Sequence, residues 1–135
     1  MEKPYPNPDP ITAPYWKACN EEKLIYQMCS ACNTVQPFPR AVCVSCSAHS
    51  DSLAWHDSNK KGTLTTFTLV HRGPNKAFKD DQPYLLALVD LNEGFRLMVN
   101  LRDCKESDLI IGMPISIVFE KRGPQEQRIP QARIN

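Results

Sequence analysis

The chain has 135 residues, the size of one ordinary domain or of two small modules joined in sequence. Its 16 basic and 15 acidic residues nearly cancel, which disfavours a nucleic-acid-binding protein, because such proteins usually carry a strongly basic face. The sequence shows neither a signal peptide nor an apolar segment long enough to cross a bilayer, so we expect a cytoplasmic protein with reduced thiols and no membrane partner.

The first predicted element is an extended arm over residues 1–11. Prolines occupy every second position from Pro4 to Pro10, and each lacks the backbone N–H that regular secondary structure requires. We therefore predict an exposed segment that either frays or lies on a partner.

A short helix is predicted after the arm, ending near residue 23. Thr12 is a suitable N-cap, and Pro14 fits the first turn, where its missing N–H costs nothing. Trp16 lies on the apolar side of this helix with Tyr15 and Cys19. The indole of Trp16 either packs on its own domain or helps to hold a ligand or partner.

Four cysteines form the most informative motif. The pair Cys29 and Cys32 is separated by ten residues from the pair Cys43 and Cys46, and each Cys-x-x-Cys turn can place two sulfurs at adjacent corners of a tetrahedron. This spacing predicts a zinc ribbon. Two disulfides are the alternative, but a secreted disulfide scaffold normally has an export signal and more widely dispersed cysteines. Because four protein ligands leave no open position on the ion, we expect one structural zinc.

The residues that follow each cysteine pair are Asn33 and Ser47, at positions where positive φ is common and glycine is favoured. Asparagine tolerates that conformation and serine less so. With four cysteines present, His49 and His56 are surplus as ligands. Residues 24–28 and 53–57 are predicted as strands of the ribbon, and residues 34–42 as the part between the cysteine pairs, which is interrupted at residues 37–40.

Within the ribbon, prolines flank an aromatic residue and precede a cation in the order Pro37, Phe38, Pro39, Arg40. Phe38 is hard to bury locally and is a candidate contact residue. Arg40 is either solvated, as most arginines are, or held in a direction that suits a phosphate or a carboxylate.

From residue 62 onward the sequence becomes rich in β-forming residues with a period of two. A glycine at the left-handed position of the loop 92–94 predicts a hairpin, and Ser107 is a possible cap for one helical turn ending at Gly112. The expected strands cover residues 63–70, 84–91, 95–101 and 115–120. This order predicts a five-stranded barrel of the OB type, whose fifth strand comes from residues 53–57 or from the tail.

The loop over residues 71–83 is long, and we predict a mobile contact element there. It carries Arg72, Lys76, Phe78 and Lys79. The fold class is thus mainly β, with an arm and helix over 1–24, a zinc ribbon over 25–57, a barrel over 58–122 and a tail over 123–135.

The order of these parts resembles a known family. The Pro14-Tyr15-Trp16 helix and the four cysteines around Pro39-Arg40 are followed by a barrel with Gly62-x-Leu64, Pro83-Tyr84, Glu93-Gly94 and Gly112-x-Pro114-Ile115. The chain is similar over nearly its whole length to acyl-CoA-associated proteins built from a helix, a rubredoxin-like zinc ribbon and an OB fold. Asn33 and Ser47 depart from the glycines that this family favours.

The resemblance implies a non-catalytic accessory subunit that binds or positions a CoA thioester for a thiolase-like enzyme or another acyl-CoA enzyme. A CoA ligand needs cations for its phosphates and apolar surface for adenine and the pantetheine arm. The cations would come from Arg40, Arg72, Lys76 and Lys79, and the apolar surface from Trp16, Phe38 and Phe78.

Two other classes of function stay open on the sequence. A single-stranded nucleic-acid-binding protein would use aromatic residues on the barrel, chiefly Phe67 and Phe95. An autonomous zinc enzyme would require an exchangeable position on the metal.

Overall fold

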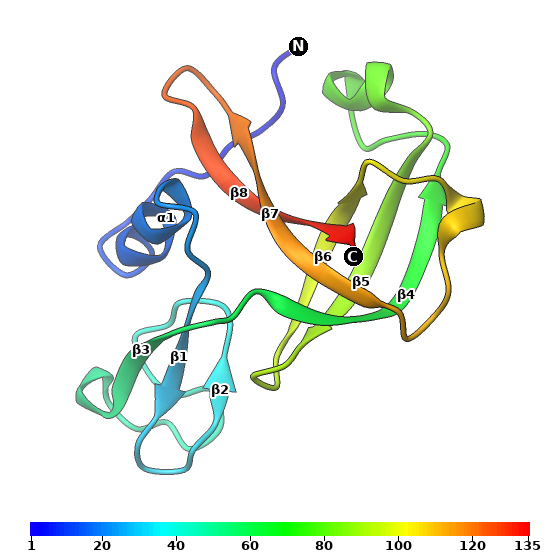
Figure 1. The fold of residues 1–135 in the computed structure, drawn as a ribbon. Coiled ribbons are helices and arrows are strands. Elements are labelled where there is room, and N and C mark those ends of the chain that lie inside the picture. Colours follow the sequence, from blue (N-terminus) through cyan, green and yellow to red (C-terminus); the bar gives the residue numbers. More distant parts are fainter.

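The computed structural model describes residues 1–135 and has the mainly β architecture that the sequence predicts, in two parts with one helix beside them (Figure 1). Its strands lie in a small sheet and in a closed barrel. The elements in chain order are α1 (Ala13–Asn20), β1 (Ile25–Cys29), β2 (Val35–Gln36), η1 (Ser50–Ser52), β3 (Leu53–Asp57), β4 (Lys61–Val70), η2 (Lys76–Asp81), β5 (Tyr84–Leu91), β6 (Arg96–Arg102), η3 (Glu106–Asp108), β7 (Pro114–Arg122) and β8 (Gln127–Ile134).

Helix α1 is shorter than predicted and is capped differently. The Thr12 side chain makes no capping hydrogen bond; its hydroxyl instead accepts from the Asp9 N–H over 3.0 Å. The Asp9 carboxylate accepts from the N–H groups of Ile11 and Thr12 and so closes the turn before the helix. Glu22, at φ +59°, leaves the right-handed region and ends the continuation toward residue 23. None of the helices is long and apolar enough to span a membrane.

The small sheet has the order β2-β1-β3, with both neighbours antiparallel to β1. Residues 53–57 close this ribbon, as predicted. The segment 34–42 forms a strand only at Val35 and Gln36 and is interrupted at Pro37, as predicted, because Pro37 and Pro39 have no N–H to donate to a neighbouring strand. The segment after Gln36 is therefore a loop.

The barrel is closed in the order β4-β5-β6-β8-β7. Gly94 has φ +100° in the hairpin between β5 and β6, as predicted. Of the two predicted sources of the fifth strand, the structure selects the tail: β8 pairs antiparallel with β7 and parallel with β6. The turn before β7 is capped by Asp108, which accepts from the Lys105 N–H over 2.8 Å, and Ser107 lies inside that turn instead of capping it.

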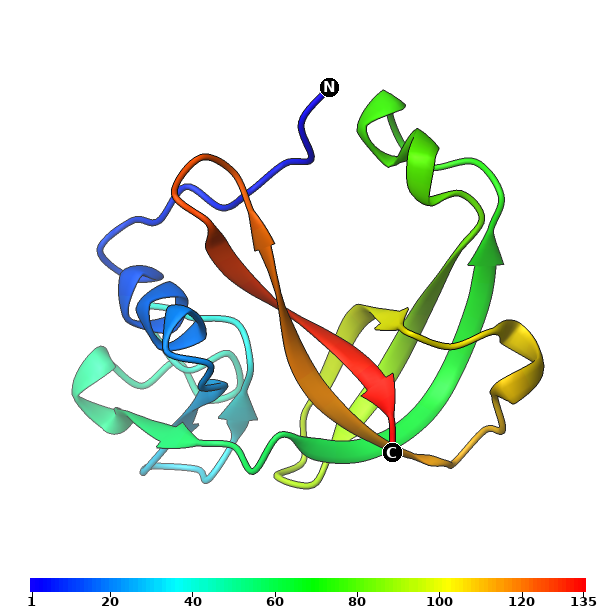
Figure 2. The same cartoon turned by 45° about the horizontal axis from the view of Figure 1, so that its top comes forward.

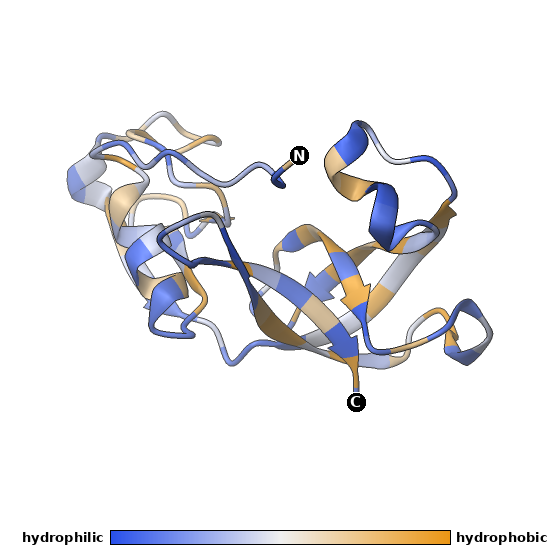
Figure 3. Ribbon diagram, turned by 90° about the horizontal axis from the view of Figure 1, so that it is seen from above, coloured by the Kyte–Doolittle hydropathy of each residue, from blue (hydrophilic) through white to orange (hydrophobic).

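One hydrophobic core of 18 buried residues joins the two parts. Hydrophobic and hydrophilic residues alternate along the barrel strands (Figure 3), and the inward residues fill the barrel. Tyr26 of the ribbon packs against Phe95 of the barrel with ring centroids 5.1 Å apart. Because Phe95 is buried and Phe67 packs against the same core, neither residue offers an exposed stacking platform for nucleic-acid bases.

A candidate metal centre beside an apolar groove

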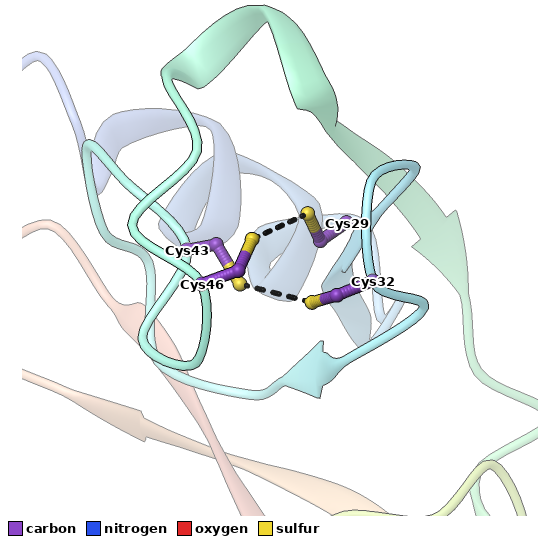
Figure 4. Close-up of side chains that lie close together, drawn as sticks. All are labelled: Cys29, Cys32, Cys43 and Cys46. Carbon is purple, nitrogen blue, oxygen red and sulfur yellow. Dashed lines mark hydrogen bonds between the residues drawn. The ribbon is translucent and has the colours of Figure 1, made fainter.

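The four cysteine sulfurs converge at the end of the ribbon (Figure 4). Sγ of Cys29 lies 3.7 Å from Sγ of Cys46, Sγ of Cys32 lies 3.6 Å from Sγ of Cys43, and all four lie within 4.8 Å of one another. Tetrahedral Zn–S bonds of about 2.3 Å place sulfurs about 3.8 Å apart, whereas a disulfide requires about 2.05 Å. The donor set therefore fits one zinc ion and excludes the two disulfides.

Both cysteine pairs have the backbone of a zinc knuckle. The Asn33 N–H donates to the Cys29 carbonyl over 2.8 Å, and the Ser47 N–H donates to the Cys43 carbonyl over 3.0 Å. Asn33 and Ser47 both have φ +63°, which confirms the left-handed conformation predicted after each pair. These turns direct both sulfurs of each pair toward the sulfurs of the other pair.

The electrostatics of the four thiols favour a cation. Hydrogen bonding of Cys32 with the side chain and the backbone of Thr34 lowers the pKa of the Cys32 thiol to about 6. The Ala48 N–H lowers the pKa of Cys46, but the neighbouring sulfurs and burial outweigh it and raise that pKa to about 12. Four thiolates in one cluster thus repel one another, and a bound dication removes that repulsion.

A large groove lies beside the ribbon. It has a volume of about 1010 Å³ and is bounded by the N-terminal arm, α1, the loop 38–40 and the outer face of β5, β6 and β8. Figure 2 shows the arm running from α1 across the end of the β7–β8 hairpin toward η2. Segments from both ends of the chain therefore build one site.

The floor of the groove is apolar although it belongs to the outside of the barrel. Leu86, Met98 and Ile129 line it, and the Met98 side chain is 67% exposed. The sequence analysis did not single out these residues. The continuous apolar run over 84–91 could have indicated an apolar outer face, because a strand that is apolar on both faces is normally covered on both.

The structure brings five of the seven predicted contact residues to this groove and leaves two outside its lining. Those that line the groove are Trp16, Phe38, Arg40, Arg72 and Phe78. Lys76 and Lys79 lie on η2 and do not line it. Phe78 is half-buried, with its ring 6.0 Å from that of Tyr84 and 5.7 Å from the Arg122 guanidinium.

The arginines of the groove differ in their availability. Arg122 is 12% exposed, donates to Glu120 and to the Pro4 carbonyl, and is thereby committed to the fold. Arg40 and Arg72 are exposed, and their side chains make no hydrogen bond or ion pair. These two arginines are the available anion-binding groups of the groove.

The arm is largely exposed, as predicted, but it lies on its own barrel and not on a partner. Lys3 forms ion pairs with Asp81 and with Glu120, the latter over 3.5 Å. Tyr5 packs on Gly123, where an added Cβ would lie 2.7 Å from the ring. Pro4, Tyr5 and Pro6 thereby become a wall of the groove.

Acidification is expected to loosen this arm. Burial raises the pKa of Glu120, but a hydrogen bond from Gln131 and the charges of Arg122, Lys3 and Arg102 outweigh it, so the pKa lies below its usual value. Glu120 therefore stabilises the docked arm fully at pH values above the unfolded-state pKa of a glutamate, which is about 4.3. This stabilisation is lost as the pH falls through the lower pKa that Glu120 has in the folded protein. The NMR signals of the Tyr5 ring, which packs on Gly123, measured against pH check this expectation.

The Glu120→Gln variant is expected to show the Tyr5 signals of a free arm already at neutral pH, with little further change on acidification. Glu126→Gln is the matched control, because Glu126 is 70% exposed and pairs only with Lys121. If the Tyr5 signals of the wild-type protein do not change as the pH falls, Glu120 does not hold the arm.

Residues 16–52 match the model of the ChsH2 rubredoxin-like zinc ribbon domain, and residues 55–120 match that of the ChsH2 C-terminal OB-fold domain. A "DUF35 domain-containing scaffold protein" of Methanocaldococcus jannaschii is 32% identical over 114 residues, which are 84% of this chain and 79% of that protein. A solved structure described as "Ltp2-ChsH2(DUF35) aldolase" has a TM-score of 0.80 and 29% identity, covering 96% of this chain and 98% of that chain.

A longer relative is the "Probable enoyl-CoA hydratase alpha subunit" of Thermomonospora curvata, 30% identical over 125 residues. The aligned part is 91% of this chain, but the chain spans only 37% of that relative's length. The remainder of that relative has no counterpart in this alignment.

Proposed function

The chain belongs to the DUF35 family of scaffold proteins, which joins a ChsH2-type zinc ribbon to an OB fold, and from this premise we propose that it is a non-catalytic accessory subunit that binds an acyl-CoA thioester for a thiolase-like partner. The names of its relatives support this class of partner, since one is a scaffold protein, one belongs to an aldolase complex and one is a subunit of an enoyl-CoA hydratase. The zinc, bound by Cys29, Cys32, Cys43 and Cys46, supplies structure only.

The observation that carries the proposal is an apolar groove with two unpaired arginines. CoA combines anionic phosphates, an adenine ring and a long pantetheine arm. Arg40 and Arg72 are available for the phosphates, while Trp16, Phe38 and the apolar floor offer surface for the adenine and the arm. A volume of about 1010 Å³ is at the upper end of the size range of small-molecule sites, which suits a ligand as large as CoA.

The chemistry is assigned to the partner because the groove lacks the groups that thiolase-type reactions need. No cysteine, histidine, lysine or carboxylate lines it. The two cysteines outside the metal cluster, Cys19 and Cys104, do not line it either. Burial raises the pKa of Cys19 to about 12, so this thiol stays protonated and unreactive.

Calorimetry with CoA tests the proposal directly. Replacing Arg40 or Arg72 with alanine is expected to weaken CoA binding about fivefold to tenfold each, because each removes one charge-assisted contact at an exposed site. Lys76→Ala and Lys79→Ala are matched controls that remove the same charge from outside the lining, and they are expected to change the affinity less than about twofold.

Binding should also be measured with the thiolase-like partner present, after co-purification of the two proteins. The proposal is wrong if the chain binds no CoA thioester either alone or with that partner. Equal losses from the lysine and arginine variants would place the phosphates outside the groove.

A further inference from the structure

Two buried glutamines connect the metal ribbon to the wall of the groove. Gln27 on β1 is 6% exposed and Gln36 on β2 is 3% exposed. They face each other across the β1–β2 pair, and Gln36 Nε2 donates to Gln27 Oε1 over 2.8 Å. Because buried amides are costly unless they are hydrogen-bonded, the two side chains hold each other in place.

One end of this glutamine pair fixes Arg40. Gln27 Oε1 accepts from the Arg40 N–H over 3.0 Å, and Gln27 Nε2 donates to the Arg40 carbonyl over 3.1 Å. A single side chain thus holds both backbone groups of a residue that follows two prolines, where the loop has few hydrogen bonds of its own. Arg40 lines the groove, but neither glutamine does.

The other end of the pair fixes the second zinc knuckle. The Val44 N–H donates to Gln36 Oε1 over 3.0 Å, and Val44 follows the metal ligand Cys43 directly. Gln36 Nε2 also lies 3.4 Å from the Val42 carbonyl. An unbroken series of hydrogen bonds therefore runs from the knuckle through both glutamines to Arg40.

We infer that Gln27 and Gln36 are positioning residues that transmit the geometry of the metal-bound knuckle to Arg40 and so set the affinity of the groove for its anionic ligand. A fixed backbone lowers the cost of ordering the arginine when the ligand binds. The effect on CoA rests on the proposed function, whereas the effect on the Arg40 backbone does not.

The decisive variant is Gln36→Met in the full-length, zinc-loaded protein, because Gln36 touches neither Arg40 nor the groove. Methionine keeps the length of the side chain and removes its hydrogen bonds. Hydrogen exchange of the Arg40 and Val44 amides is expected to accelerate about tenfold, with β5 and β6 unchanged, and CoA affinity is expected to fall about fivefold. Unchanged exchange at Arg40 would overturn the inference.

A double variant shows whether the two glutamines act on Arg40 as one connected series or independently of each other. If the glutamines act in series, Gln27→Met with Gln36→Met weakens CoA binding no more than Gln27→Met alone, whereas independent roles would multiply the two losses. Multiplied losses overturn the inference.

Two controls accompany these variants. Ile25→Val weakens β1 without touching the glutamines and should leave Arg40 exchange unchanged, and Gln125→Met removes a glutamine from the exposed β7–β8 turn. Accelerated Arg40 exchange in Ile25→Val would assign the effect to general loss of stability and overturn the inference. If the wild-type chain binds no CoA, only the proposed function fails, and exchange at Arg40 still decides the role of the glutamines.

Discussion

Removal of the metal is expected to unfold the ribbon while the barrel stays folded. Between residues 28 and 57 the buried residues are only Cys29, Gln36 and Cys43, so this part of the chain has no apolar core of its own. Structural zinc contributes about 10 kcal/mol or more to the folding of such segments, far above any other single contact here. The barrel has its own core, built around Leu64, Val89 and Ile115.

Cys43→Ser, or treatment with a strong chelator, tests this expectation. Metal analysis should fall from one zinc per chain toward none, and hydrogen exchange should become fast across β1, β2 and β3 but stay slow in β4 to β8. Cys104→Ser is the matched control, since Cys104 is half-buried and lies outside the cluster. A metal-free protein that keeps slow exchange in the ribbon would show that zinc does not build it.

Loss of the ribbon also removes one wall of the groove. Phe38 and Arg40 come from the loop that the ribbon carries, and Tyr26 anchors β1 on the barrel through Phe95. We therefore expect the metal-free chain to lose CoA binding together with ribbon structure. Retention of CoA binding by a chain with an unfolded ribbon would place the ligand elsewhere on the barrel.

The metal centre and most of the strands could be predicted because their signals are local. A Cys-x-x-Cys turn fixes its own geometry, and the position with positive φ, here Asn33, directly follows the second cysteine of the pair. The period-two pattern of β-forming residues defined β4 to β7 to within two residues, because inward and outward side chains must alternate.

The groove could not be predicted because it is assembled from distant segments. Nothing near Pro4 in the sequence indicates that the arm lies on the barrel, since the ion pairs of Lys3 are made with residues more than seventy positions away. The parallel contact of β8 with β6 likewise has no local signal. Gln27 and Gln36 look like ordinary surface residues in the sequence, and only their pairing across two strands reveals a role.

One loop illustrates the difference between composition and placement. Arg72, Lys76 and Lys79 are equally cationic and lie within eight residues, so the sequence alone could not rank them. The turn η2 begins with the Ala77 N–H donating to the Asn75 side chain over 2.8 Å, and its two lysines fall outside the lining. Arg72, which precedes the turn, lines the groove.

Placing a carboxylate on the floor of the groove is expected to abolish ligand binding without unfolding the protein. Met98 is 67% exposed and points away from the barrel interior, so Met98→Glu should change the free energy of unfolding little. An unpaired carboxylate covered by a bound ligand loses its hydration and repels the phosphates, at a cost of several kcal/mol, which corresponds to at least about a hundredfold loss of CoA affinity.

Calorimetry with CoA and thermal unfolding of the same samples measure the two effects separately. Thr68→Glu is the matched control, because Thr68 is exposed on β4 outside the groove and receives the same charge. Met98→Leu keeps the apolar surface and should bind CoA within about threefold of the wild-type protein. If Met98→Glu binds CoA as the wild type does while Arg40→Ala still weakens binding, the phosphates lie at the rim and the pantetheine arm does not cross the floor of the groove.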